Sequence, residues 1–134
     1  MHGHLIVAHL LDGKVLKGTS LDVDPKKPSC HLRPRDGESV EIALADTKAL
    51  FFVKTETGRP AYNETRTPAS GDARLVGTKR VKVRFADSEE IVGLMNRFPP
   101  ITPYFYMLPI DPTSNNIRIL VNRAAVKEMA ELDG

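Results

Sequence analysis

The sequence contains no tryptophan and only one cysteine, Cys30, among 134 residues. A single cysteine excludes an internal disulfide and every zinc site that needs two cysteines. No apolar run approaches the length of about eighteen residues that a membrane-spanning helix needs, and the N-terminus lacks a basic segment followed by an apolar one. We therefore expect neither a membrane span nor a signal peptide, and we predict a cytoplasmic protein.

The chain also lacks a large excess of charge of either sign, because its formal net charge is only +2. A value so close to neutral does not by itself indicate a nucleic-acid partner, so any electrostatic recognition has to be local.

Catalytic patterns are missing as well. Cys30 and His31 are neighbours in a predicted strand, where successive side chains point to opposite faces, so they do not form a nucleophile–base pair. The chain has no glycine-rich phosphate loop and no metal-ligand spacing. We predict no enzymatic activity, no catalytic residue, no cofactor and no metal.

An internal repeat is the strongest pattern present. A shift of 75 positions aligns residues 6–36 with residues 81–111 without a gap. Six identities result, all of them Gly, Pro or Asp: Asp12/Asp87, Gly18/Gly93, Pro25/Pro100, Pro28/Pro103, Pro34/Pro109 and Asp36/Asp111. These residue types mark turns, so their agreement indicates a shared fold. A further two-residue insertion then aligns Val40 with Ile117 and Ile42 with Ile119.

Each copy has the period of two that is typical of half-buried strands, as in Arg80 to Phe85. The expected strands cover residues 5–11, 14–22, 29–33, 39–45, 48–53, 79–86, 90–97, 104–108, 116–122 and 125–130. Residues 124–132 could instead form a short helix on propensity alone. Asp12-Gly13 indicates a hairpin turn, and Gly18 and Gly93 indicate crowded or bent backbone. The expected organisation is a first unit over 1–53, a polar linker over 54–78 and a second unit over 79–134.

The stretch from Ala8 to Asp22, with its Asp-Gly turn and the central Gly18, resembles the first sequence motif of Sm-like proteins. The whole chain also resembles an uncharacterised bacterial family with this doubled unit. The resemblance implies an all-β fold of two tandem, small, five-stranded Sm-like or SH3-like barrel units packed together. The residues with which Sm proteins bind RNA bases are not recognisable here: Asp24 to Pro28 and Ala45-Asp46 stand at those places.

Two surface patterns are candidates for binding. Lys79, Arg80, Lys82 and Arg84, the basic strip, share a strand and could follow a phosphate backbone, although a solvated outer face would look the same. Phe98, Tyr104 and Tyr106 cluster among prolines, and the two tyrosines should point outward while Phe105 enters the core. Exposed tyrosines suit a protein contact, but a sheet or subunit could also cover them.

The first strand carries Leu5 and Val7 on its outer side, where the second copy carries arginine and lysine. We expect this strand to be covered on both faces, by the second unit or by another subunit. The leading functional hypothesis is a non-enzymatic protein-interaction module of a bacterial cytoplasm whose partner is another protein or a second copy of the chain. The alternative is an Sm-like RNA-binding protein. A cyclic-dinucleotide sensor, suggested by the spacing of Arg80 and Arg84, comes third.

Overall fold

The computed structural model describes residues 3–55, 77–110 and 114–132, and these ranges form an all-β protein. Ten strands lie in them: β1 His4–Leu10, β2 Val15–Ser20, β3 Ser29–Leu32, β4 Val40–Ala43, β5 Thr47–Val53, β6 Lys79–Phe85, β7 Glu90–Met95, β8 Tyr104–Pro109, β9 Asn116–Asn122 and β10 Val126–Glu131. Short 3-10 turns, η1 Leu44–Asp46 and η3 Arg123–Ala125, precede β5 and β10. All ten expected strands are thus present, nine of them with shifted ends and Asn116–Asn122 with the expected bounds, and residues 126–131 form a strand rather than a helix.

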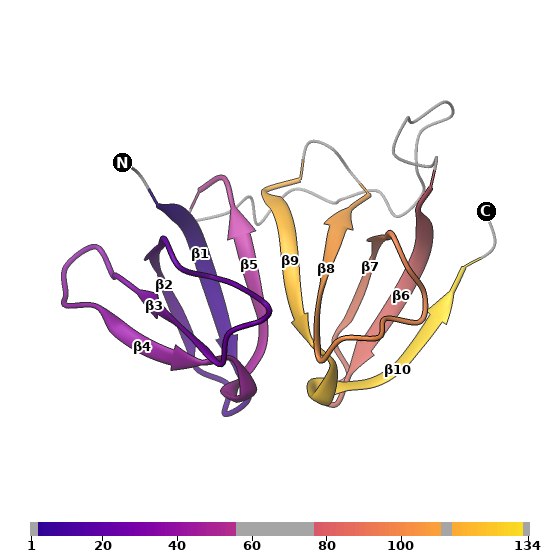
Figure 1. The fold of residues 1–134 in the computed structure, drawn as a ribbon, viewed down its shortest axis with the longest axis horizontal. Coiled ribbons are helices and arrows are strands. Elements are labelled where there is room, and N and C mark those ends of the chain that lie inside the picture. The colour runs from indigo at the N-terminus through magenta and orange to yellow at the C-terminus, as the bar shows by residue number, and fades with distance from the viewer. Residues whose placement is uncertain (1–2, 56–76, 111–113, 133–134) are drawn as a thin grey trace.

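Eight strands form one antiparallel sheet in the order β10-β6-β7-β8-β9-β5-β1-β2, and β3 and β4 form a second, two-stranded sheet. A bridge between Thr19 and Arg33 links β2 to β3. Figure 1 shows two curled groups of strands side by side, with β5 and β9 adjacent at the centre. We call residues 3–55 the first half and residues 77–132 the second half.

The expected architecture was two small barrel units packed together, and no closed barrel is seen among the described residues. The sheet runs through both halves because β5 pairs with β9 from Ala49↔Val121 to Val53↔Asn116. The runs Ala49–Val53 of β5 and Ile119–Val121 of β9 are apolar on both faces. On the outside of a barrel, one of these apolar faces would be exposed to water. The pairing buries them instead: Leu50 and Leu120 pack in the first core, while Ala49 packs in the second.

Two hydrophobic cores result, one in each half. The first contains Ile6, Ala8, Cys30, Leu32, Ile42, Leu44, Leu50, Phe52 and Leu120. The second contains Ala49, Val81, Val83, Phe85, Met95, Phe105, Met107, Ile119, Val121 and Ala125. Each core therefore includes a side chain from the other half, which couples the two.

Lys48 adds a polar clamp to the β5–β9 junction. Its side chain is 10% exposed, and its Nζ donates to the carboxylate of Asp87 at 2.8 Å and to that of Glu89 in the β6–β7 turn. The same Nζ lies 4.9 Å from the centre of the Phe85 ring. Burial alone would lower the pKa of Lys48, but the hydrogen bonds to the two carboxylates raise it, so the amine stays charged.

Contacts of the first half recur in the second half. In the β1–β2 turn the nitrogen of Gly13 donates to Leu10 at 3.1 Å, and in the β6–β7 turn Ser88 donates to Phe85 at 2.9 Å. Both donors have positive φ, 92° for Gly13 and 76° for Ser88. The hairpin expected at Asp12-Gly13 is confirmed, and its counterpart forms although a serine stands in the glycine position.

The fourth strands correspond differently from the expected alignment. Cys30 pairs with Ile42, and its counterpart Phe105 pairs with Val121. Ile42 therefore corresponds to Val121 and not to Ile119. The pairing thus matches these strands with an offset of 79, where the expected alignment had 77. The same offset matches Leu44 at the start of η1 to the first residue of η3.

The predicted linker over 54–78 lies mostly outside the described residues, since residues 56–76 are not described. At its start, the Lys54 nitrogen donates to the Asn115 carbonyl at 2.8 Å, which ties the end of β5 to the start of β9. Within the described ranges, no helix has the length and hydrophobicity required to cross a membrane.

Candidate protein-binding groove

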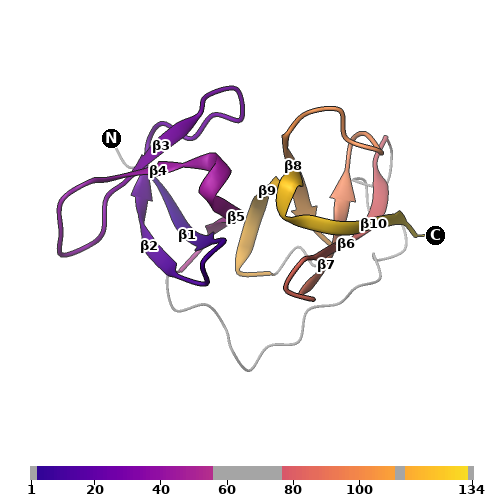
Figure 2. The same ribbon diagram turned by 90° about the horizontal axis from the view of Figure 1, so that it is seen from below.

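A groove of about 900 Å³ lies between the β2–β3 connection of the first half and the β7–β8 connection of the second. Figure 2 shows the two connections on the same side of the molecule. The groove opens to solvent and is lined mostly by apolar atoms. The lining residues are Pro25, Lys26, Lys27, Pro28, Met95, Asn96, Arg97, Pro100, Ile101, Thr102, Pro103, Tyr104, Phe105 and Tyr106.

Both walls of the groove are fixed by hydrogen bonds to the 3-10 turns. The carbonyl of Pro28 accepts from the Leu44 nitrogen at 2.9 Å, and that of Pro103 accepts from the Arg123 nitrogen at 2.9 Å. The Arg123 side chain also donates to the carbonyl of Pro100 at 2.6 Å. Prolines at these positions restrict φ. The groove is therefore largely preformed, which reduces the ordering cost of binding.

The tyrosines of β8 form part of the floor. Tyr104 and Tyr106 are half-buried against the first core, whereas Phe105 between them is 6% exposed and belongs to the second core. The alternation expected for β8 is thus confirmed, but the tyrosines are only partly exposed. Burial raises the pKa of Tyr106, so its hydroxyl stays neutral and available for hydrogen bonding.

Arg118 of β9 packs against Tyr106. Its guanidinium lies 4.3 Å from the centre of the Phe52 ring and 5.0 Å from that of Tyr106. The two rings are 6.1 Å apart. Among the described residues the buried Nε of Arg118 has no hydrogen-bond partner. The stack holds Tyr106 in place and puts a positive charge against the ring of this groove residue.

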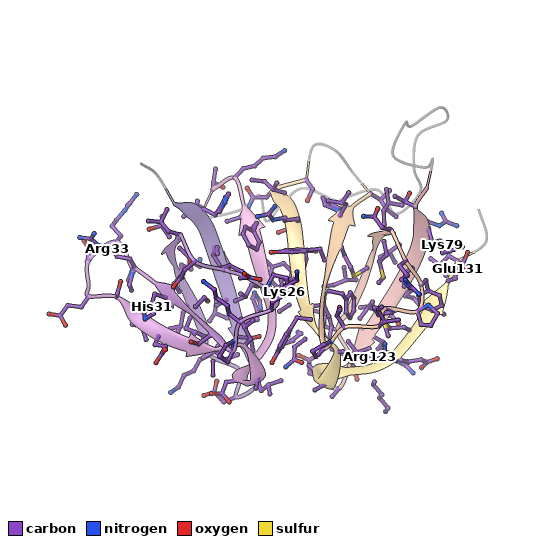
Figure 3. The ribbon with its side chains drawn as sticks, viewed as in Figure 1. Lys26, His31, Arg33, Lys79, Arg123 and Glu131 are labelled. Carbon is purple, nitrogen blue, oxygen red and sulfur yellow. The ribbon has the colours of Figure 1, made fainter. Side chains whose placement is uncertain are left out.

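The charged side chains in the groove lining are all basic. Lys26 and Lys27 lie on one wall and Arg97 on the other, and all three are exposed. Figure 3 shows Lys26 between the two halves. Asp24 precedes this wall, where its carboxylate accepts from the Lys26 nitrogen at 2.9 Å, but it is not part of the lining. The groove therefore favours an apolar ligand that carries negative charge.

The other residues predicted for protein binding lie elsewhere. Phe98 is half-buried against the second core and borders a separate small pocket beside Arg123 and β10. Leu5 and Val7 are half-buried on the outer face of β1. The strand that pairs with the second half is β5 and not β1, so these two side chains are not part of the β5–β9 pairing.

The basic strip lies on β6, next to an acidic strand. Arg84 forms an ion pair with Glu128, and Lys79 lies 3.8 Å from Glu131, both from β10. Figure 3 shows Lys79 and Glu131 together at the outer edge of the second half. These carboxylates reduce the positive potential that a phosphate backbone would require. The structure therefore supports nucleic-acid binding by the basic strip less than the sequence alone does.

A histidine–carboxylate pair stands at the base of the first groove wall. Asp22 accepts from the backbone nitrogen of His31 at 2.8 Å, and its other oxygen lies 2.7 Å from the His31 ring. Although burial alone would raise it, these hydrogen bonds hold the pKa of Asp22 at about 2, and the same contact raises the pKa of His31. Burial raises the pKa of the Cys30 thiol to about 11, so it stays protonated. The pair anchors the start of the β2–β3 connection.

Sequence reasoning found the tyrosines of the groove but missed the opposite wall. Pro25 and Pro28 served there as matched prolines of the repeat, and Asp24 to Pro28 as the place where Sm-type base-binding residues are missing. The local basic signal of Lys26 and Lys27 between two prolines was not used. Nothing in the sequence indicates that this connection faces the β7–β8 connection, because that proximity depends on the β5–β9 pairing.

The chain matches the model of one protein family over residues 2–133, described as a family of unknown function (DUF6982). No curated protein and no solved structure matches the chain.

Proposed function

We propose, for a chain that belongs to a family of unknown function (DUF6982), a role as a non-enzymatic protein-interaction module of the bacterial cytoplasm. Its partner would bind in the groove between the β2–β3 and β7–β8 connections. The single observation that carries this proposal is the groove itself, which is apolar, floored by two tyrosines and held open by walls from both halves. Aromatic side chains and arginines on a preformed surface are typical of protein contacts.

We further propose that the two halves are copies of one unit related to the Sm-like and SH3-like small barrels. The recurrence of the turn contacts at Gly13 and Ser88 and the matching order of strands in the two halves support this relationship. The duplication would then have a functional consequence, because the groove takes one wall from each copy.

Binding of RNA is the alternative, since tyrosines beside lysines and arginines also stack with unpaired bases. The apolar lining and the acidic neighbours of the basic strip favour a protein partner instead. A cyclic-dinucleotide site at Arg80 and Arg84 has less support, because Arg84 lies on a strand and is paired with Glu128.

The test is a selection from a phage-displayed library of random peptides. The exposed Ile101 in the groove is changed to Glu. The control variant is Leu11→Glu, because Leu11 is also an exposed large aliphatic residue and lies outside the groove; the two residues are 73% and 55% exposed. Selected peptides should bind the parent and Leu11→Glu equally and lose at least tenfold in affinity for Ile101→Glu. Equal binding to all three proteins, or a selection that enriches nothing while random-sequence RNA binds at low salt, would exclude the groove as a protein site.

A further inference from the structure

We infer that the groove takes a short acidic segment of another protein, with apolar side chains against the tyrosines and carboxylates toward the two walls. This inference rests on the proposed function and specifies its ligand. A volume of about 900 Å³ is at the upper end of clefts that hold one small ligand or a short chain segment, and it is too small to admit a folded domain.

The charge of the lining determines the charge of the segment. Lys26 and Lys27 on one wall and Arg97 on the other place cations on both sides of an apolar floor, and no Asp or Glu is among the lining residues. Arg118, which is not part of the lining, adds a fourth positive charge against the Tyr106 ring. A segment with carboxylates on both sides of an apolar centre would be complementary to this arrangement, whereas a basic segment would be repelled from both walls.

The backbone of the walls limits how the segment can be recognised. Four prolines in the lining, Pro25, Pro28, Pro100 and Pro103, have no N–H group to donate. The carbonyls of Pro28, Pro100 and Pro103 already accept hydrogen bonds from η1 and η3. Pairing of the ligand with the wall backbone, as in strand addition to a sheet edge, is therefore not supported, and side chains have to supply affinity and specificity.

A nucleic acid fits the same lining less well. Phosphate recognition needs cations along a continuous path, but here Ile101 and the prolines separate the lysines of one wall from the arginine of the other. The comparison of peptide with RNA is accordingly one arm of the test.

The experiment uses three synthetic peptides of nine residues that share their Leu and Pro positions and carry Glu, Gln or Lys at the remaining positions. Their affinities are measured by fluorescence anisotropy at about 0.05 M and about 0.2 M salt, where screening differs. Two charge-reversal variants are compared with the parent. Lys27→Glu/Arg97→Glu changes the groove walls, and Lys17→Glu/Arg33→Glu makes the same charge change at exposed residues outside the groove.

The Glu peptide should bind the parent most tightly, the Gln peptide less tightly and the Lys peptide least. Each wall charge that is engaged should change the affinity about two- to fivefold. Lys27→Glu/Arg97→Glu should reverse that order, and Lys17→Glu/Arg33→Glu should keep it. An order that does not change with the wall charges, or a ten-nucleotide oligo(U) that binds more tightly than every peptide, overturns the inference. If the library selects groove-binding peptides without acidic residues, the inference fails while the proposed function stands; if it selects none, the proposed function fails.

Discussion

Substitution of Gly18 is the most direct probe of how β2 crosses β3. A Cβ atom at this position would overlap the Arg33 carbonyl oxygen and lie 2.7 Å from the carbonyl carbon and 3.0 Å from the Pro34 nitrogen. All three are backbone atoms, so no side chain can move to make room. The strands would have to separate, which strains the two hydrogen bonds between Thr19 and Arg33, now 2.9 and 2.8 Å long.

The expected cost of Gly18→Ala follows from these contacts. Weakening two backbone hydrogen bonds costs about 0.5–1.5 kcal/mol each, and the backbone shift adds a cost of about 1 kcal/mol or more. The smaller entropy of the unfolded alanine chain offsets about 0.4–1 kcal/mol. The free energy of unfolding should therefore fall by about 2–3 kcal/mol. Gly93→Ala should cost less, about 1–2 kcal/mol, because only the Leu108 carbonyl oxygen, at 2.7 Å, is rigid and the Met107 methyl, at 3.1 Å, can move.

Urea denaturation followed by circular dichroism measures these differences, and Gly37→Ala is the matched control. A Cβ at Gly37 would meet only side-chain atoms of Pro34, the nearer at 3.8 Å, so this variant should be neutral or slightly more stable than the parent. A Gly18→Ala protein as stable as Gly37→Ala would refute the close approach of β2 and β3.

Three further predictions concern the junction, the groove wall and the outer sheet edges. Lys48→Glu puts a buried carboxylate beside Asp87 and Glu89 and should lower the free energy of unfolding by about 3–5 kcal/mol. The control Lys127→Glu, at the corresponding exposed position of β10, should change it by less than about 0.5 kcal/mol. Equal costs in urea denaturation would contradict the clamp. The pKa of Asp22 is lowered from 3.8 to about 2, so Asp22 contributes stability that is present above pH 4 and lost as the pH falls toward 2. The pKa of His31 is raised, so His31 contributes stability that is present below pH 6.5 and lost above its folded pKa. The difference in Tm between the parent and Asp22→Asn should therefore be largest between about pH 4 and 6.5, and a difference that is constant from pH 2 to 9 would show that the pair does not titrate as described. Glu41 and Glu128 occupy the places that Leu120 and Ala49 take in the junction. They should therefore prevent head-to-tail pairing of the outer edges of β4 and β10, which no other strand of the described ranges covers. Light scattering should find a monomeric parent and larger assemblies of Glu41→Leu/Glu128→Ala, and an assembling parent would disprove this role.

The local parts of the fold could be predicted from the sequence. Alternation along β6 placed Val81, Val83 and Phe85 in a core, and Asp12-Gly13 gave the first hairpin, because both depend on neighbours within a few residues. The β5–β9 junction could not be predicted in the same way. Its strands are separated by more than sixty residues, and their apolar runs are compatible with burial in either half, in both, or against another subunit.

The candidate site also has one part that local sequence predicts and another that depends on distant strand pairing. Tyr104 and Tyr106 were identified from their spacing and from the match of Phe105 to Cys30, because the two faces of a strand alternate whatever surrounds it. The wall from Pro25 to Pro28 was missed as a binding element, since only the junction brings it opposite the β7–β8 connection. The basic strip illustrates the reverse error, because the acidic residues of β10 that pair with it lie more than forty positions away in the sequence.

The central claim, that the groove is the binding surface, is tested most directly by chemical-shift mapping in nuclear magnetic resonance. A peptide selected from the library is added to the labelled protein, and the backbone amide shifts are followed. The largest changes should lie at Lys26, Lys27, Asn96, Arg97, Ile101, Tyr104 and Tyr106, all of which line the groove. Changes centred on the basic strip, or on the outer face of β1 at Leu5 and Val7, would contradict the account.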